Sequence, residues 1–164
     1  MAEDEFEARN DISIKNDVAT WNIKAEGAIL GTYVGTFEFR CYLSPSQHLS
    51  AGRERRDLLG KNAVLADDDE RFYAYALTQL KYRVISAPPF WDNSKKNGEY
   101  SGDIPDIEIL SQILDAAISA EVIYKRQLNE RKKAAVERAK AAAEKILQQR
   151  KADESKTEEN PTES

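Results

Sequence analysis

The chain has 164 residues, of which 41% are hydrophobic and 32% are charged, and its formal net charge is −5. The length predicts one domain with tails, and the single cysteine and single histidine exclude an internal disulfide or a zinc site built from several such ligands. The acidic start is unlike a signal peptide, and no apolar run reaches the roughly 18 residues that span a bilayer, so we expect a soluble cytoplasmic protein without a membrane partner.

Charge is segregated along the sequence. Residues 1–11 carry a net charge of −4, residues 125–151 carry ten basic residues against three glutamates for a net charge of +7, and residues 152–164 again carry −4. Polar, charge-rich ends cannot bury enough apolar surface to fold alone. We therefore expect disordered acidic tails at 1–11 and 152–164, a folded body at 12–124 and a charged helical extension at 125–151.

Two segments near the N-terminus have the character of strands. Val18–Lys24 is a short candidate, and residues 25–27 supply a turn after it. From Ile29 to Leu43 the odd positions are apolar, aromatic or glycine, and this alternation is typical of a half-buried strand. The segment is long for one strand, so we expect Gly31 or Gly35 to mark a bulge or bend. The two segments predict a β-hairpin or a small antiparallel sheet.

The next segment carries clear signals for the two ends of a helix. Ser44 can cap the N-terminus, Pro45 suits the first helical position, and Gln47 completes a capping box. Gly60 is a good residue to end the helix. A helix is therefore expected from Pro45 to about Leu59.

A second helix is expected at residues 70–85, opened by the acidic run Asp67–Glu70 and ended by the residues 86–89, which include two prolines. Its apolar residues form one stripe, which indicates that one face is buried. We expect the acids to act on the helix dipole, since they lack the ligand spacing and glycine of a calcium loop.

One long helix is expected from Asp103 to Lys151, with Asp103 as its cap and Pro105 in its first turn. Its first half is apolar on most of its circumference, which is typical of a buried helix. Its second half favours helix strongly but has too few large apolar residues for a core of its own. At about 1.5 Å per residue the whole helix would reach roughly 70 Å and project beyond a body of this size.

The sequence offers no convincing catalytic constellation. Cys41 lies on the apolar face of its predicted strand, where a buried and inert thiol is the ordinary expectation. His48 lies in the first turn of an arginine-rich helix, at the surface. We therefore expect no enzyme activity, no cofactor and no metal site.

Contact with another protein is the first functional expectation. Phe90 and Trp91 follow a proline pair in a predicted loop, an arrangement suited to an interaction hot spot. The alternative, which ranks somewhat ahead, is that both rings tuck under the helices and close the core. In the charged extension an alanine-rich stripe near coiled-coil spacing could admit a partner helix or a second copy of the chain. The predicted partner-binding residues are Trp21, Phe90, Trp91, Leu128, Ala135, Ala139, Ala142 and Ile146.

Nucleic-acid binding by the basic helix is the alternative. The cations wrap around the helix instead of lining one face, no aromatic residue for base stacking follows Tyr124, and glutamates recur every seven residues. These features favour a solvated helix with local ion pairs. The residues that would contact phosphates are Arg126, Arg131, Lys132, Lys133, Arg138, Lys140 and Lys145.

Three stretches carry an overall resemblance to a known group of proteins. They are GTYVGTFEFRCYLSPSQHLSAGRERRDLLG, FYAYALTQLKYRVISAPPFW and the long helix with its charged end. The resemblance covers about residues 18–125 and is to small tail-assembly and virion-associated proteins of tailed bacteriophages, including tail assembly chaperones. It implies a non-enzymatic role, a tail or tape-measure protein as partner, and a location in the host cytoplasm or the virion.

The sequence therefore predicts an α+β protein, in which an N-terminal β-hairpin or small antiparallel sheet packs on helices and a long C-terminal helix projects from the body. The predicted function is a protein-binding assembly factor or minor structural protein of a phage. Tail assembly chaperones are typically largely helical, whereas this chain contains a predicted strand segment.

Overall fold

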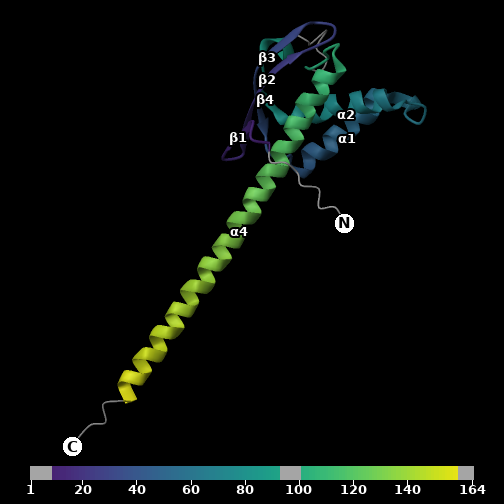
Figure 1. Ribbon diagram of the computed structural model, residues 1–164. Helices are drawn as coiled ribbons and strands as arrows, with labels where there is room; N and C mark the ends of the chain where they lie inside the picture. Colours follow the sequence, from purple (N-terminus) through teal and green to yellow (C-terminus); the bar gives the residue numbers. More distant parts are fainter. Residues whose placement is uncertain (1–8, 93–100, 159–164) are drawn as a thin grey trace, which may run out of the picture. The chain divides into compact units, whose positions relative to one another are not determined.

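The computed structural model describes residues 9–92 and 101–158 and divides into two units, Met1–Tyr124 and Lys125–Ser164. The first unit holds a four-stranded sheet and the helices that cover one of its faces (Figure 1). The second unit consists, in its described part, of the later turns of one helix. The predicted α+β class, with a small antiparallel sheet packed on helices and a long C-terminal helix, is confirmed.

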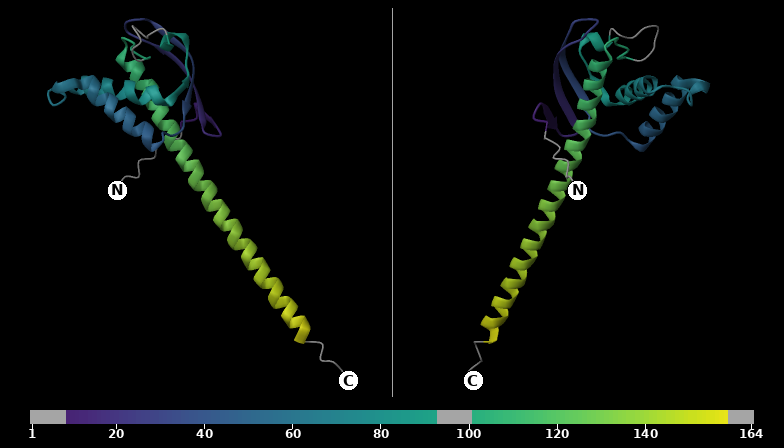
Figure 2. Two further views of the ribbon diagram at one scale, coloured as in Figure 1. Left: turned by 180° about the vertical axis from the view of Figure 1, so that it is seen from behind. Right: turned by 45° about the vertical axis from the view of Figure 1, so that its right-hand side comes forward.

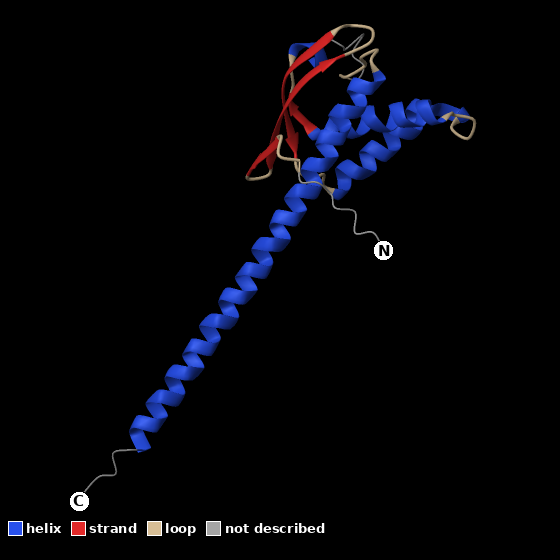
Figure 3. Ribbon diagram, viewed as in Figure 1, coloured by secondary structure: helices blue, strands red, loops and turns tan. Residues whose placement is uncertain are grey.

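The sheet is an antiparallel meander in the order β1-β2-β3-β4 (Figure 3). Strands β2 and β3 are the two longest and pair along their whole length, with Trp21 opposite Phe37 and Ala19 opposite Phe39. Since side chains alternate between faces, this register places the apolar odd positions of both strands on one face. The strands are β1 (Ile12–Lys15), β2 (Val18–Glu26), β3 (Thr32–Arg40) and β4 (Val84–Ser86).

Gly35 shapes β3 through its lack of a side chain. A Cβ atom at this position would lie 2.3 Å from Cγ of Pro88, so the residue lets the segment after β4 pack directly on the strand. Gly31, the other predicted bend, lies outside β3 in the loop before it, with φ of 81°. The predicted strand from Ile29 to Leu43 is therefore shorter at both ends in the structure.

Helices α1 (Pro45–Leu59) and α2 (Asp68–Arg83) lie side by side and are joined by the 3₁₀ turn η1 (Gly60–Asn62) and the residues after it (Figure 2). Helix α1 starts with the predicted capping box, in which the backbone N–H of Ser44 donates to Gln47 and that of Gln47 donates to Ser44 Oγ. Helix α2 has the same device in Asp67 and Glu70.

Four short elements were not expected from the sequence: β1, η1, β4 and a helix after β4. Residues 84–86, predicted as the end of a helix, form β4 and pair with β3 at Glu38 and Phe39. Residues Pro89–Asp92 form the short helix α3, where a loop was predicted.

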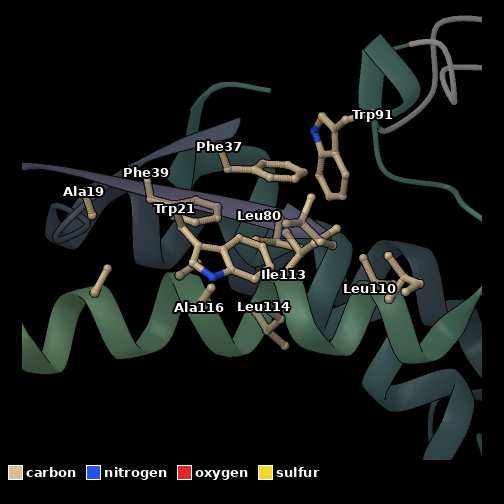
Figure 4. Close-up of a cluster of buried hydrophobic side chains, with 14 of the residues drawn as sticks. Ala19, Trp21, Phe37, Phe39, Leu80, Trp91, Leu110, Ile113, Leu114 and Ala116 are labelled. Carbon is tan, nitrogen blue, oxygen red and sulfur yellow. The ribbon is translucent and has the colours of Figure 1, made fainter. Parts of the chain in front are cut away.

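Helix α4 runs from Ile107 to Glu158. In the first unit its buried face, which includes Ile109, Ile113 and Ala116, covers the aromatic face of the sheet. Figure 4 shows the resulting core, in which Trp21, Phe37 and Phe39 lie between the strands and the helix. An ion pair between the buried Arg83 and the half-buried Glu121, with an N–O distance of 2.6 Å, joins this part of α4 to α2.

Residues 9–11 and 152–158 are structured, although they belong to the segments predicted as disordered tails. Arg9 forms ion pairs with Asp11 and Asp115, and the Asp11 carboxylate accepts a 2.8 Å hydrogen bond from the indole N–H of Trp21. Residues 9–11 are thus held on the body, and residues 152–158 continue α4, where disorder was predicted. Residues 1–8 and 159–164 of the predicted tails lie outside the described residues.

Candidate functional site

An apolar cleft of about 1020 Å³ opens in the first unit, where α1 and α2 meet the start of α4. Helix α1 contributes its last turn, the α1–α2 connection contributes two residues, and α2 contributes one face of its first half. We call this feature the cleft. Its lining residues are Leu58, Leu59, Leu65, Ala66, Asp69, Glu70, Tyr73, Ala74, Leu77, Asp103 and Ile107.

Helix α1 is poorly buried for a helix of its length. Of its 15 residues only Ala51 is buried. Leu58 is 45% exposed at the edge of the cleft, and Leu65 in the following connection is 82% exposed. Fully burying a leucine side chain contributes about 1.5–3 kcal/mol, so a partner that covered these residues would gain a substantial part of its binding energy here.

Helix α2 presents a regular face to the cleft. Tyr73 and Leu77 are spaced i, i+4, and Ala74 lies beside them. Neighbours at this spacing form a ridge on the helix surface, and the small side chain of Ala74 leaves room for close approach. The α2 wall of the cleft therefore has the ridge-and-groove pattern on which another helix can pack.

All three charged residues that line the cleft are acidic: Asp69, Glu70 and Asp103. Asp69 and Glu70 lie in the first turn of α2, where carboxylates also favour the helix dipole. The phenol of Tyr73 donates a hydrogen bond to Asp103 Oδ1. Burial, together with this hydrogen bond, raises the pKa of Tyr73 well above its usual value, so its hydroxyl remains a neutral donor at physiological pH.

The carboxylate of Asp106, three residues after Asp103, holds the β2–β3 loop in place. Asp106 accepts hydrogen bonds from the backbone N–H of Ile29 at 2.8 Å, from that of Leu30 at 3.1 Å and from the Tyr33 hydroxyl at 2.7 Å. Desolvation of the buried carboxyl acts to raise its pKa, but hydrogen bonds from Tyr33 and the loop backbone outweigh it and lower the pKa of Asp106. Asp103 and Asp106 thus tie the start of α4 to α2 and to the sheet.

The structure uses two of the predicted contact residues in its core. Trp21 is 4% exposed and Trp91 is 2% exposed, and the Trp91 ring packs edge-on against Phe37 with centroids 5.5 Å apart (Figure 4). These rings therefore stabilise the fold and offer almost no surface to a partner. This corrects the expectation for Trp21, whereas for Trp91 it agrees with the alternative in which the ring closes the core. Phe90 is half-buried, with its ring 5.0 Å from that of Tyr33.

The predicted stripe on the extension lies in the second unit. Leu128 is half-buried, whereas Ala135, Ala139, Ala142 and Ile146 are exposed. Ile146 is 53% exposed, and two larger apolar residues outside the stripe, Val136 and Leu147, are 52% and 56% exposed. The stripe remains a candidate contact surface.

The predicted phosphate-binding residues lie on the same helix and are all exposed. The Nζ atom of Lys140 lies 4.0 Å from Glu137, an ion pair within one turn of the helix. The set consists of Arg126, Arg131, Lys132, Lys133, Arg138, Lys140 and Lys145.

Cys41 is fully buried, and desolvation raises the pKa of its thiol to about 11. His48 is exposed on α1. Within residues 9–92 and 101–158, no group of three or more His, Cys, Asp or Glu side chains is arranged to hold a metal ion. Across those same ranges, no helix combines the length and apolar character needed to cross a membrane.

Sequence reasoning missed the cleft, with Leu65, Tyr73 and Asp103 among its residues. One signal was available. A 15-residue helix with few large apolar residues, followed by the pair Val64–Leu65 in a connection, indicates apolar surface that the chain does not bury. The role of Asp103 depends on contact with α2 and has no local signature.

Comparison with protein-family models, with curated proteins and with solved structures finds no match to this chain.

Proposed function

We propose that this chain is a non-enzymatic assembly factor that binds another protein through the cleft. The observation that carries the proposal is the exposed apolar lining: Leu58 and Leu65 are 45% and 82% exposed beside the buried Leu77. An apolar surface rimmed by charged residues is typical of protein–protein contact. Because α1 buries so little of itself, a partner seated in the cleft would also stabilise the helix pair.

The resemblance of the sequence to tail-assembly proteins of tailed phages supplies the kind of partner. A chaperone of that kind would hold hydrophobic helices of a tape-measure protein in solution until tail subunits polymerise. An apolar cleft in a charged protein suits this task, since it covers apolar surface on the client while its own charge keeps the complex soluble. The client is thus proposed to be a helical phage tail protein, with self-association as the other protein-binding mode.

A second candidate function is nucleic-acid binding by residues 125–151. The observation in its favour is the exposure of all seven predicted cations on α4. Glu130, Glu137 and Glu144 are interleaved with them and reduce the attraction to phosphates. We rank this function second for that reason.

Co-expression with the products of the neighbouring genes tests the first function. Wild type and Leu65→Asp are compared, with Leu49→Asp as the matched control, because Leu49 is 64% exposed on α1 but does not line the cleft. We expect one neighbouring product to co-purify with wild type and with Leu49→Asp, and to be lost with Leu65→Asp. Equal recovery with all three variants would contradict binding through the cleft.

An electrophoretic shift assay with a salt titration tests the second function. Binding that persists at about 150 mM salt with a steep dependence on salt would favour nucleic acid as the partner. No shift at that salt, together with recovery of a protein partner, supports the assembly factor.

A further inference from the structure

We infer that the cleft receives an amphipathic helix of another protein, about three turns long, with an apolar face and basic residues along its edge. This inference rests on the proposed function and names the chemistry of its partner. It follows from the walls of the cleft, from its length and from the sign of its charges.

The walls indicate that the occupant is a helix. Along α2 from Tyr73 to Leu77, the backbone N–H and C=O groups are bonded within the helix. An extended segment would find no main-chain partners along this stretch and would have to bury unpaired groups of its own. A helix satisfies its own backbone, and its side-chain ridges can pack beside Tyr73, Ala74 and Leu77.

The length of the cleft sets the length of the occupant. Its residues on α2 run from Asp69 to Leu77. Eight steps at about 1.5 Å per residue give a wall of roughly 12 Å, or a little over two helical turns. A helix of about ten to twelve residues covers this wall and overhangs it slightly at each end.

The charge of the cleft sets the charge of the occupant. Its three charged side chains are Asp69, Glu70 and Asp103, and the ion pairs found between described residues include none of them. Glu70 and Asp103 also accept hydrogen bonds, from the backbone N–H of Asp67 and from Tyr73. Lysine or arginine at the edge of the bound helix would meet all three carboxylates, whereas acidic residues there would be repelled.

Two labelled model peptides test the inference by fluorescence anisotropy. Each has 14 residues, with leucines at i, i+3, i+4 and i+7 for an apolar face. One carries lysines along the edges of that face, and the other carries glutamates at the same positions. At about 50 mM salt we expect the lysine peptide to bind wild type at least about tenfold more tightly, with a smaller difference at about 500 mM salt.

Variants locate the binding. Leu65→Asp is expected to weaken binding of the lysine peptide at least tenfold. Leu49→Asp is expected to leave that binding unchanged. Asp69→Lys is expected to reduce the preference for the lysine peptide. Its control is Asp68→Lys, because both residues are exposed in the first turn of α2 but only Asp69 lines the cleft. Circular dichroism confirms that each variant keeps its helix content.

The outcomes separate this inference from the proposed function. Equal binding of the two peptides, or equal effects of Asp69→Lys and Asp68→Lys, overturns the inference that the bound helix carries basic residues along its edge. If neither peptide binds while Leu65→Asp still abolishes recovery of a protein partner, the helix inference fails and the proposed function stands. If wild type dimerises in sedimentation experiments and Leu65→Asp is monomeric, a second copy is the occupant and the inference is overturned. If Leu65→Asp changes none of these readouts, both fail.

Discussion

The hydroxyl of Tyr33 donates a 2.7 Å hydrogen bond to Oδ2 of Asp106, a residue 73 positions further along the chain. This bond joins β3 to the residue that precedes α4, and the same carboxylate fixes the backbone of Ile29 and Leu30. A buried carboxylate with three donors is stable as the anion, whereas loss of a donor leaves it less compensated. This carboxylate therefore adds a polar link to the apolar contact between the sheet and α4.

Replacement of Tyr33 by phenylalanine should lower the free energy of unfolding by about 1–2 kcal/mol, because the ring stays in place and one hydrogen bond to a charged acceptor is lost. Urea denaturation measures the change. Tyr42→Phe is the matched control, since Tyr42 is 48% exposed and its ring stacks on Tyr124. The two variants should differ clearly in midpoint, and equal midpoints would show that the hydroxyl of Tyr33 contributes nothing to stability.

The lowered pKa of Asp106 predicts a dependence of stability on acid pH. Since the pKa falls from its ordinary value of 3.8, the folded state favours the ionised form, and this stabilisation is present above that value and is lost as the pH falls through the lower pKa. The difference in unfolding free energy between wild type and Asp106→Asn should be constant from about pH 7 to pH 5 and shrink below about pH 4. A difference that grows towards acid pH would contradict the assignment.

Two glycine substitutions should have opposite effects. Gly35→Ala places a methyl group 2.3 Å from Cγ of Pro88, so we expect a loss of about 1–3 kcal/mol from overpacking. Gly52→Ala lies inside α1, and apart from the local backbone and its chain neighbours no atom is within 4 Å of the added carbon, so it should stabilise the protein by about 0.5–1 kcal/mol. Thermal unfolding of both variants decides the matter. A stabilised Gly35→Ala variant would show that Pro88 is not packed as described.

The thiol of Cys41 should react slowly in the folded protein. Its side chain is fully buried, and desolvation raises its pKa to about 11, so very little thiolate is present near pH 8. A thiol-specific disulfide reagent should modify it at least about a hundredfold faster in urea than in buffer. Rapid modification of the native protein, followed by absorbance, would place the thiol at the surface.

Local signals made part of the fold predictable. The capping box of α1 joins Ser44 to Gln47, three residues apart, so its chemistry is legible in the sequence and its prediction is confirmed. The same holds for the alternation that defines β3, although both ends of that strand were predicted too far out. Strand β1 went unnoticed because only four residues form it, even though the turn residues Asn16 and Asp17 follow it directly.

The remaining parts of the fold depend on contacts between residues far apart in the sequence. Strand β4 exists because Ser86 pairs with Glu38 across a wide gap in sequence, whereas residues 84–86 read locally as the end of a helix. Asp103 and Asp106 are equally good capping residues by composition, and α4 begins after the second of them. Their acceptor roles depend on Tyr73 and Tyr33, which lie on other elements, so no local pattern could assign them.

The three-residue spacing between Asp103 and Asp106 limits where the chain can accept insertions or deletions. Asp103 accepts from a tyrosine on α2, Asp106 accepts from a tyrosine on β3, and the buried Ile104 lies between them. One inserted or deleted residue in this short span would shift one carboxylate out of reach while the other stayed in place. Related chains should therefore tolerate length changes elsewhere in their loops but keep this interval at three.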